Sequence, residues 1–270
     1  MKDYVENQAK EYIRMLDLIM SHGNTISPRG MEIHEIEDLQ LTVDPRVPFM
    51  TFEDRNYDIN YFKKEMRWKL GANRYDDSIE QHAKMWSNVK NPDGTFNSNY
   101  GQYWFGEQHG IWDVVTELLR DGDSRRAVIP MLNASHMAPH VKDTVCTECV
   151  GFRIRNDKLN MSVHMRSSDV IFGLGTDIPT FAFLLRLVYG LVRFHTSRHL
   201  LPGTIMITAM SSHIYSRHYE MVKNLISRGT GGFRLEAMPF EVDAMKVIAS
   251  RGDREILKGS GRLGEWLCQD

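Results

Sequence analysis

Cysteine is scarce in this chain, with three residues, Cys146, Cys149 and Cys268, among 270. An odd and sparse set of thiols argues against a disulfide framework and favours a reducing compartment. Cys146 and Cys149 have the CxxC spacing of a redox motif or half a zinc site, but no second CxxC follows them. Four ligands are the rule for structural zinc, so we expect no metal site.

The chain also lacks an excess of charge of either sign, because its formal net charge is only −2. No global basic field therefore argues for direct nucleic-acid binding, and an anionic substrate would need local arginines. The N-terminus has no hydrophobic targeting core, and no run approaches the roughly 20 apolar residues that a membrane span requires. We expect a cytoplasmic protein that does not associate with membranes.

The length and the 42% apolar content suit one large globular domain, with two smaller domains as the alternative. Helical spacing of apolar residues predicts amphipathic helices over residues 4–20, 58–70 and 78–89, and an almost wholly apolar, buried helix over 178–194. Strands are predicted over residues 31–43, 127–132, 149–155, 159–165 and 204–210, with a hairpin turn at Asn156-Asp157. The pattern indicates one mixed α/β domain with a central sheet packed by long helices.

Several residues could carry chemistry. Cys146 precedes a predicted strand and is either a nucleophile, if nearby cations favour its thiolate, or a small buried apolar residue. Arg166 closes a strand and opens a Gly-containing turn, which suits an anion clamp. The Arg125-Arg126 pair could bind phosphate in the same way, although exposed arginine pairs are common at protein surfaces.

Two further sites are ambiguous by pattern alone. His213 and Tyr215 alternate along an extended segment, so both polar tips face one side, where they could bind a sugar hydroxyl or simply pack. Glu65 lies in an amphipathic helix four residues before Lys69, which favours a surface ion pair. A general acid or base role for Glu65 would require burial.

The order and spacing of these residues are similar to those of the thymidylate synthase superfamily. The resemblance covers roughly residues 20–225, and the segment from Arg166 to Asp177 is its most specific part. The matching positions are Glu65, Trp68, Trp86, Tyr100-Gly101, Asp123-Ser124-Arg125-Arg126, Cys146, Arg166-Ser167, Asp169-Val170, Gly173 and His213-x-Tyr215-Ser216. The resemblance implies a thymidylate synthase-like α/β (α+β) fold, with a large mixed sheet packed by long helices and a homodimer formed sheet to sheet.

The departures from a true thymidylate synthase are as informative as the matches. The family's Pro-Cys-His reads Val145-Cys146-Thr147, its Asn is Asp177, its Gly-Asp before the His-x-Tyr pair is Ser211-Ser212, and its second tryptophan is Val89. Each departure resembles the phage-type deoxycytidylate hydroxymethylases, as do the segments Asn97-Ser98-Asn99-Tyr100-Gly101 and Ser212-His213-Ile214-Tyr215-Ser216-Arg217-His218.

The exchange at Asp177 has a direct physical reason. An Asn side chain offers one acceptor and one donor, which match the N3–H and O4 of uracil. Cytosine presents an amino donor at N4 and an unprotonated N3. A carboxylate accepts a hydrogen bond from N4, and its charge favours protonation at N3. Asp177 therefore indicates a cytosine substrate.

The resemblance also implies a mechanism. Cys146 would add to C6 of the pyrimidine, and C5 would then attack the one-carbon unit of 5,10-methylenetetrahydrofolate, the co-substrate. Glu65 would manage protons and position a water, with Tyr100 in the surrounding network. The residues implied near the folate are Trp86, Asp169 and Gly173.

The remaining implied roles concern the nucleotide, deoxycytidylate (dCMP) or a related pyrimidine nucleotide. Arg166 and Ser167 would hold the 5′-phosphate, and His213 and Tyr215 the sugar 3′-hydroxyl. In the family the paired arginines reach across a dimer interface, so Arg125 and Arg126 would serve the neighbouring subunit's site. These roles, like those of the catalytic residues, follow from the resemblance alone.

Four functions remain open at this stage. The preferred one is dCMP hydroxymethylation with release of tetrahydrofolate. The others are dCMP methylation with release of dihydrofolate, hydroxymethylation of ribocytidylate, and nucleotide binding or assembly without turnover. Presence of Cys146, Glu65 and Asp177 together argues against the silent binder, and loss of the second tryptophan at Val89 favours entry of water over hydride transfer.

Overall fold

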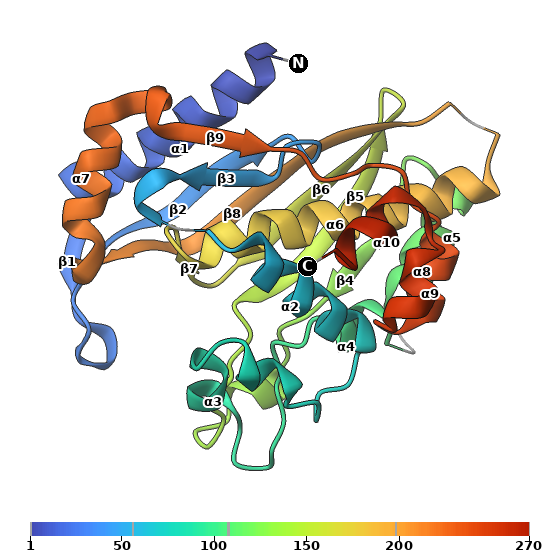
Figure 1. The fold of residues 1–270 in the computed structure, drawn as a ribbon, viewed down its shortest axis with the longest axis horizontal. Coiled ribbons are helices and arrows are strands. Elements are labelled where there is room, and N and C mark those ends of the chain that lie inside the picture. The colour runs from blue at the N-terminus through green and yellow to red at the C-terminus, as the bar shows by residue number, and fades with distance from the viewer. Residues whose placement is uncertain (1, 56, 107–108, 198, 270) are drawn as a thin grey trace. The chain divides into compact units, whose positions relative to one another are not determined.

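The computed structural model describes residues 2–55, 57–106, 109–197 and 199–269 (Figure 1). The helices in these residues are α1 (Lys2–His22), α2 (Ile59–Gly71), α3 (Met85–Val89), α4 (Gly101–Trp104), α5 (Ile111–Arg120), α6 (Gly173–His195), α7 (Tyr219–Arg228), α8 (Ala244–Ser250), α9 (Arg254–Lys258) and α10 (Gly261–Leu267). The strands are β1 (Asn24–Ile26), β2 (Ile33–Val43), β3 (Phe49–Phe52), β4 (Val128–Pro130), β5 (Thr147–Arg155), β6 (Lys158–Met165), β7 (Ser168–Asp169), β8 (Leu201–Tyr215) and β9 (Phe233–Glu236).

The chain divides into two compact units. The first unit contains residues 1–57, 161–183 and 203–238, and the second contains 58–160, 184–202 and 239–270. The predicted α/β class, with a large mixed sheet and helices, is confirmed. The single-domain expectation stays a prediction.

The first unit is built on a mixed sheet. Strand β2 pairs antiparallel with both β1 and β8, and the short β7 pairs parallel with β8. The register places Ile33 opposite Tyr215 and Glu35 opposite His213. Helix α1 packs on β2 and on α7, and β3 and β9 form a separate antiparallel pair (Figure 1). The α1, β2 and β8 elements confirm the predictions for residues 4–20, 31–43 and 204–210.

The second unit surrounds α2, which confirms the helix predicted over residues 58–70. The carboxylate of Asp58 caps its N-terminus by accepting from the backbone N–H groups of Asn60 and Tyr61, and Ala72 ends it in the left-handed region. Helices α8, α9 and α10 pack together, and both α8 and α10 contact α2 (Figure 1). Strands β4 and β5 pair antiparallel.

The predicted turn at Asn156-Asp157 is confirmed. The two residues have φ angles of 51° and 56°, the positive values of a type I′ turn, and they join β5 to β6. Asn and Asp tolerate this region better than other non-glycine residues do, which is why the dipeptide is a turn signal.

The helix predicted over residues 78–89 is wrong, because the structure has two shorter segments there. A 3-10 turn covers Ser78–Gln81, and α3 begins only at Met85. Ile79 and Trp86 are seven residues apart, a helical spacing, and both pack against Trp68 and Phe96. Two separate turns bring them to one aromatic cluster, so the periodicity reflects shared burial and not one helix.

Helix α6 is long and apolar, as the sequence predicts for residues 178–194. By length and composition alone α6 is apolar enough to cross a membrane, but 78% of its most apolar window is buried inside the molecule. Residues 173–183 belong to the first unit and the rest to the second. It is a core helix, as the apolar pattern over residues 178–194 predicts.

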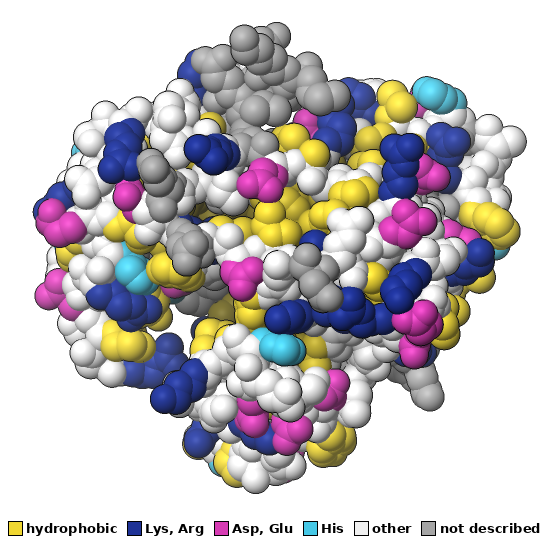
Figure 2. All heavy atoms as spheres, viewed as in Figure 1, with side chains coloured by type: hydrophobic (Ala, Val, Ile, Leu, Met, Phe, Trp, Pro, Cys, Tyr) yellow, Lys and Arg dark blue, Asp and Glu magenta, His cyan; other side chains and the backbone are white. Residues whose placement is uncertain are grey.

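Charged side chains of both signs are interspersed over the face shown in Figure 2. This distribution agrees with the formal net charge of −2.

Candidate functional site

Glu65 and Lys69 form a buried ion pair on α2. Their side chains are 7% and 3% exposed, and the Lys69 Nζ lies 2.6 Å from the Glu65 Oε1. The predicted pairing one helical turn apart is confirmed, but its predicted place at the surface is wrong. Burial satisfies the condition that an acid or base role for Glu65 requires.

Tyr100 lies against this pair. The ring is 5% exposed, and the Lys69 ammonium is 4.9 Å from its centroid, within the range of a cation–π contact. The Tyr100 hydroxyl oxygen accepts a hydrogen bond of 3.1 Å from the Thr147 Oγ1. Tyr100 therefore connects the charged pair on α2 to the segment that carries Cys146.

The motif from Asn97 to Gly101 fixes Tyr100 in this place. The Asn99 side-chain amide donates to the carbonyl oxygens of Trp68 and Asn73, at the C-terminal end of α2. The Asn97 amide donates to the Asp143 carbonyl, three residues before Cys146. The motif thus holds both α2 and the Cys146 segment by direct hydrogen bonds.

Cys146 is half-buried and immediately precedes β5, as the sequence predicts. The next residue, Thr147, is fully buried. Cys149 differs in its surroundings, because burial and then the negative charge of Glu148 raise the pKa of its thiol. Of this CxxC pair, Cys149 is therefore poorly suited to supply a thiolate.

Trp86 is buried in the cluster with Trp68, Ile79 and Phe96, and its indole N–H donates to the Tyr61 hydroxyl over 2.9 Å. Val89, which stands where the family has a second tryptophan, packs at the edge of this cluster. A contact of Trp86 with folate stays a prediction.

Asp169, Gly173 and Asp177 come together in the first unit. The Asp169 Oδ1 accepts from the backbone N–H groups of Ile171 and Phe172, which orders the turn that leads into α6. A Cβ atom at Gly173 would lie 3.4 Å from the Asp169 Cβ and 3.9 Å from the Asp177 Oδ2. The backbone of Gly173 therefore lies close to the side chains of both Asp169 and Asp177.

His213 and Tyr215 lie next to this group, near the C-terminal end of β8. Their ring centroids are 5.1 Å apart and perpendicular, so the predicted shared face is confirmed. Strand β7 places Asp169 beside His213 in parallel register. Burial lowers the pKa of His213, an effect that Asp169 partly opposes, so its imidazole is neutral near pH 7.

The Ser211 hydroxyl and the Glu35 carboxylate form a hydrogen-bonded group next to His213. The Ser211 Oγ contacts the His213 Nδ1 at 3.4 Å and donates to Glu35 on the neighbouring strand. Ser211 is one of the positions that depart from the family, where Gly-Asp is usual. Sequence reasoning missed Glu35, and only the register of β2 on β8 could have indicated it.

The arginines differ in exposure. Arg125 and Arg126 are exposed, as a reach toward another subunit would require, and the Arg126 N–H donates to the Ser124 Oγ. Arg166 and Ser167 are half-buried between β6 and β7. Phosphate binding by any of these four residues stays a prediction.

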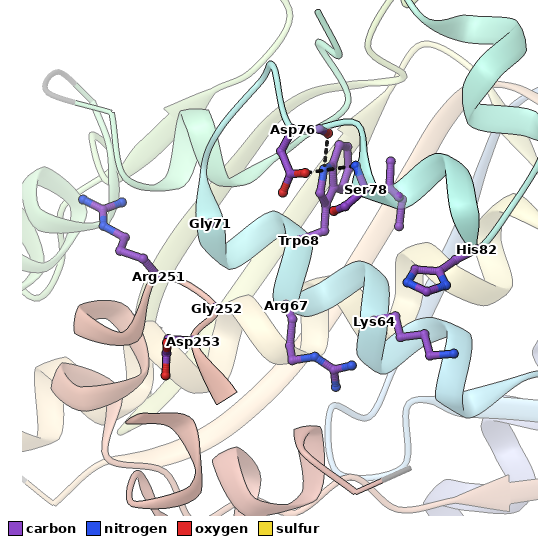
Figure 3. A pocket seen from close by; sticks show the side chains of 11 residues that line it. Lys64, Arg67, Trp68, Gly71, Asp76, Ser78, His82, Arg251, Gly252 and Asp253 are labelled. Carbon is purple, nitrogen blue, oxygen red and sulfur yellow. Dashed lines mark hydrogen bonds between the residues drawn. The ribbon is translucent and has the colours of Figure 1, made fainter. Parts of the chain in front are cut away.

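A pocket of about 440 Å³ lies on another side of α2 (Figure 3). Lys64, Arg67 and Trp68 line it from α2, and Arg251 lines it from the loop after α8. None of the residues predicted for the site contributes to it. Among the described residues, no group of three or more His, Cys, Asp or Glu side chains could hold a metal ion.

The profile of the family described as Thymidylate synthase matches residues 10–247. The chain belongs to the thymidylate synthase family. This membership confirms the resemblance seen in the sequence. Members of the family are folate-dependent one-carbon transferases that act on pyrimidine nucleotides, with methylenetetrahydrofolate as co-substrate.

Individual relatives are similar at modest identity. The deoxycytidylate 5-hydroxymethyltransferase of Enterobacteria phage T2 is 28% identical over 212 residues, which are 76% of this chain and 84% of that protein. The protein of the same description from phage T4 is 29% identical, over 73% of this chain and 81% of its own. A putative thymidylate synthase of Methanosarcina barkeri is 28% identical, over 80% of this chain and 89% of its own.

Proposed function

We propose that this enzyme converts dCMP, 5,10-methylenetetrahydrofolate and water to 5-hydroxymethyl-dCMP and tetrahydrofolate. The observation that carries the proposal is Asp177, a carboxylate where the family reads the base with Asn, in a chain similar to phage deoxycytidylate 5-hydroxymethyltransferases. We place the reaction in the cytoplasm, which would be the host's if the gene belongs to a phage.

Cys146 is the proposed nucleophile. Its thiolate forms a bond to C6, and the electron pair of the C5–C6 double bond becomes available at C5. Asp177 supports this step by accepting from N4 and favouring a proton at N3, so the ring holds the added electron density as a neutral enamine. C5 can then form its bond to a carbon electrophile.

Methylenetetrahydrofolate supplies that carbon at the oxidation level of formaldehyde. Trp86, Asp169 and Gly173 are the proposed contacts, and the short distance of Gly173 from Asp169 and Asp177 supports a folate site beside the residue that reads the base. Once C5 is bonded to this carbon, the C5 proton leaves to water and the carbon–nitrogen bond to the folate breaks, which releases tetrahydrofolate and leaves an exocyclic methylene at C5. Water adds to that methylene, and the C5–C6 double bond forms again as the bond between Cys146 and C6 breaks. Glu65, buried and paired with a cation, takes the proton from that water as general base.

The nucleotide's other groups have proposed partners as well. Arg166 and Ser167 bind the 5′-phosphate, and the neutral His213 and Tyr215 bind the 3′-hydroxyl. Exposure of Arg125 and Arg126 supports their reaching the 5′-phosphate in a neighbouring subunit of a homodimer.

A second candidate is methylation of dCMP with release of dihydrofolate. The similarity to a putative thymidylate synthase over 80% of this chain favours it. The difference lies in the last step, because a methylase delivers hydride where a hydroxymethylase admits water. Val89, which is smaller than the tryptophan it replaces, supports the entry of water in this step and therefore the hydroxymethylase.

The mass of the product distinguishes dCMP hydroxymethylation from dCMP methylation. The enzyme is incubated with dCMP and methylenetetrahydrofolate while absorbance follows dihydrofolate. A gain of one CH2O unit without dihydrofolate supports the proposal, and a gain of one CH2 unit with dihydrofolate supports the methylase. Cys146→Ser is the control, which should bind dCMP and form neither product. Turnover in that variant, or wild-type enzyme without either product, would overturn the proposal.

A further inference from the structure

Lys69 is a buried cation that neither the family resemblance nor the proposed chemistry uses. It is 3% exposed on the interior side of α2, and its Nζ is 2.6 Å from the Glu65 Oε1. Removing an ammonium group and a carboxylate from water costs free energy that an ion pair recovers only with good geometry and further contacts. Here the same ammonium also lies 4.9 Å from the Tyr100 ring centroid.

The backbone around Lys69 is closely packed. Gly101 packs directly on the Lys69 carbonyl oxygen, and Asn99 donates to the carbonyl of the preceding residue, Trp68. The side chain and the backbone of Lys69 are therefore both in contact with the Tyr100 segment. Thr147, the residue after Cys146, donates a hydrogen bond to the Tyr100 hydroxyl. The Tyr100 segment therefore contacts both Lys69 and the residue next to Cys146.

The ion pair has a consequence for proton transfer. A buried carboxylate without a counter-charge is favoured in its neutral form, and a neutral carboxyl group cannot accept a proton from water. A cation at hydrogen-bond distance favours the carboxylate instead. The same cation, held over the Tyr100 ring, fixes the position of Glu65 relative to that ring.

We propose that Lys69 is a positioning residue for the reaction, which holds the Glu65 carboxylate fixed beside Tyr100 so that it can act as the general base. This inference rests on the proposed function. The alternative is a purely structural ion pair that stabilises α2 without influence on turnover.

The test is a double-mutant cycle of Glu65→Gln, Lys69→Met and the double variant, with kcat, KM and pH dependence of product formation. Lys69→Met should lower kcat by about 100-fold, the usual scale of a lost general base, with the KM for dCMP changed by less than about threefold. In the Glu65→Gln background, Lys69→Met should have little further effect on kcat.

Two more variants complete the test. Lys69→Arg retains the charge and should restore most of kcat. Lys64→Met is the matched control, a half-buried lysine on the same helix that lines the pocket in Figure 3, and should behave as the wild type does. The double variant removes both charges, so it provides a folded protein even if Lys69→Met alone does not fold.

The outcomes are distinct. If the two single substitutions lower kcat by factors that multiply in the double variant, Lys69 does not act through Glu65. If Lys69→Met loses thermal stability but retains the wild-type kcat and pH profile, the ion pair has only a structural role. Wild-type enzyme that forms no product would overturn the proposed function, and this role with it.

Discussion

Gly101 packs its bare Cα against the carbonyl oxygen of Lys69, so closely that a Cβ atom there would overlap that oxygen. The glycine is buried and begins α4, directly after Tyr100. The Tyr100-Gly101 pair of the sequence motif thus has a steric reason. Only glycine lets the tyrosine segment approach α2 closely enough for the Lys69 ammonium to reach the Tyr100 ring.

Gly101→Ala should therefore destabilise the protein by about 3 kcal/mol, the upper range for overpacking, because backbone and not a flexible side chain must move. Urea unfolding at equilibrium measures this change. Gly231→Ala is the control, since a Cβ atom there meets nothing within 4 Å, and it should stay within about 0.5 kcal/mol of the wild type. Equal stabilities of the two variants would contradict the steric argument.

The sequence predicts the long elements well and the short ones poorly. Helices α1, α2 and α6 extend over several turns, so their apolar spacing is unambiguous. The segment that contains Ile79 and Trp86 fails because two short turns around an aromatic cluster produce the same spacing as one helix. The periodicity of apolar residues indicates which residues are buried, but tertiary contacts determine where one helix ends and the next begins.

The site shows a related limit. Pattern reasoning places the Glu65 and Lys69 pair at the surface, because charged residues occupy nearly every side of α2. In the structure Lys63 is also buried, with its Nζ donating to the Gln269 carbonyl and lying 5.0 Å from the Trp266 ring. The C-terminal segment thus covers one side of a helix that looks solvated by composition. No sequence pattern within α2 carries that information.

Asp177 provides a prediction about base choice. Asp177→Asn replaces an acceptor-only group by one that also donates, which matches the O4 of uracil. We expect kcat/KM for dCMP to fall by about 100-fold and measurable turnover of deoxyuridylate to appear, on the scale of one lost base-specific hydrogen-bond pair. Steady-state kinetics with both nucleotides measure the change. Unchanged preference for dCMP would remove Asp177 from base recognition.

The three thiols provide a prediction about reactivity. Burial raises the pKa of both Cys149 and Cys268, so few of these thiols are ionised near pH 7. We expect iodoacetamide to modify Cys146 at least about ten times faster than either, because alkylation requires the thiolate. Peptide mass spectrometry over a time course gives the three rates, and excess dCMP should slow only the reaction at Cys146. Faster modification at Cys149 would contradict the assignment of Cys146 as nucleophile.

His136 provides a prediction about stability and pH. Its imidazole is buried, its Nδ1 accepts from the Asn133 N–H, and its Nε2 lies 3.2 Å from the Tyr103 hydroxyl oxygen. The Tyr103 hydroxyl donates to the Asn97 carbonyl, and the Asn133 Nδ2 lies 3.1 Å from the same His136 Nε2. Burial, and then the positive charge of Arg74, lower the pKa of His136.

A histidine whose pKa is lower in the folded than in the unfolded protein stabilises the fold only while it is neutral. The unfolded chain binds the proton more tightly, so this contribution is complete above the ordinary histidine pKa of about 6.5 and is lost as the pH falls through the lowered value. The urea midpoint should therefore fall between pH 7.5 and pH 5, and His136→Gln should show a smaller fall. His82→Gln removes an exposed histidine and should retain the wild-type dependence. An equal fall in all three proteins would show that protonation of His136 does not contribute to acid sensitivity.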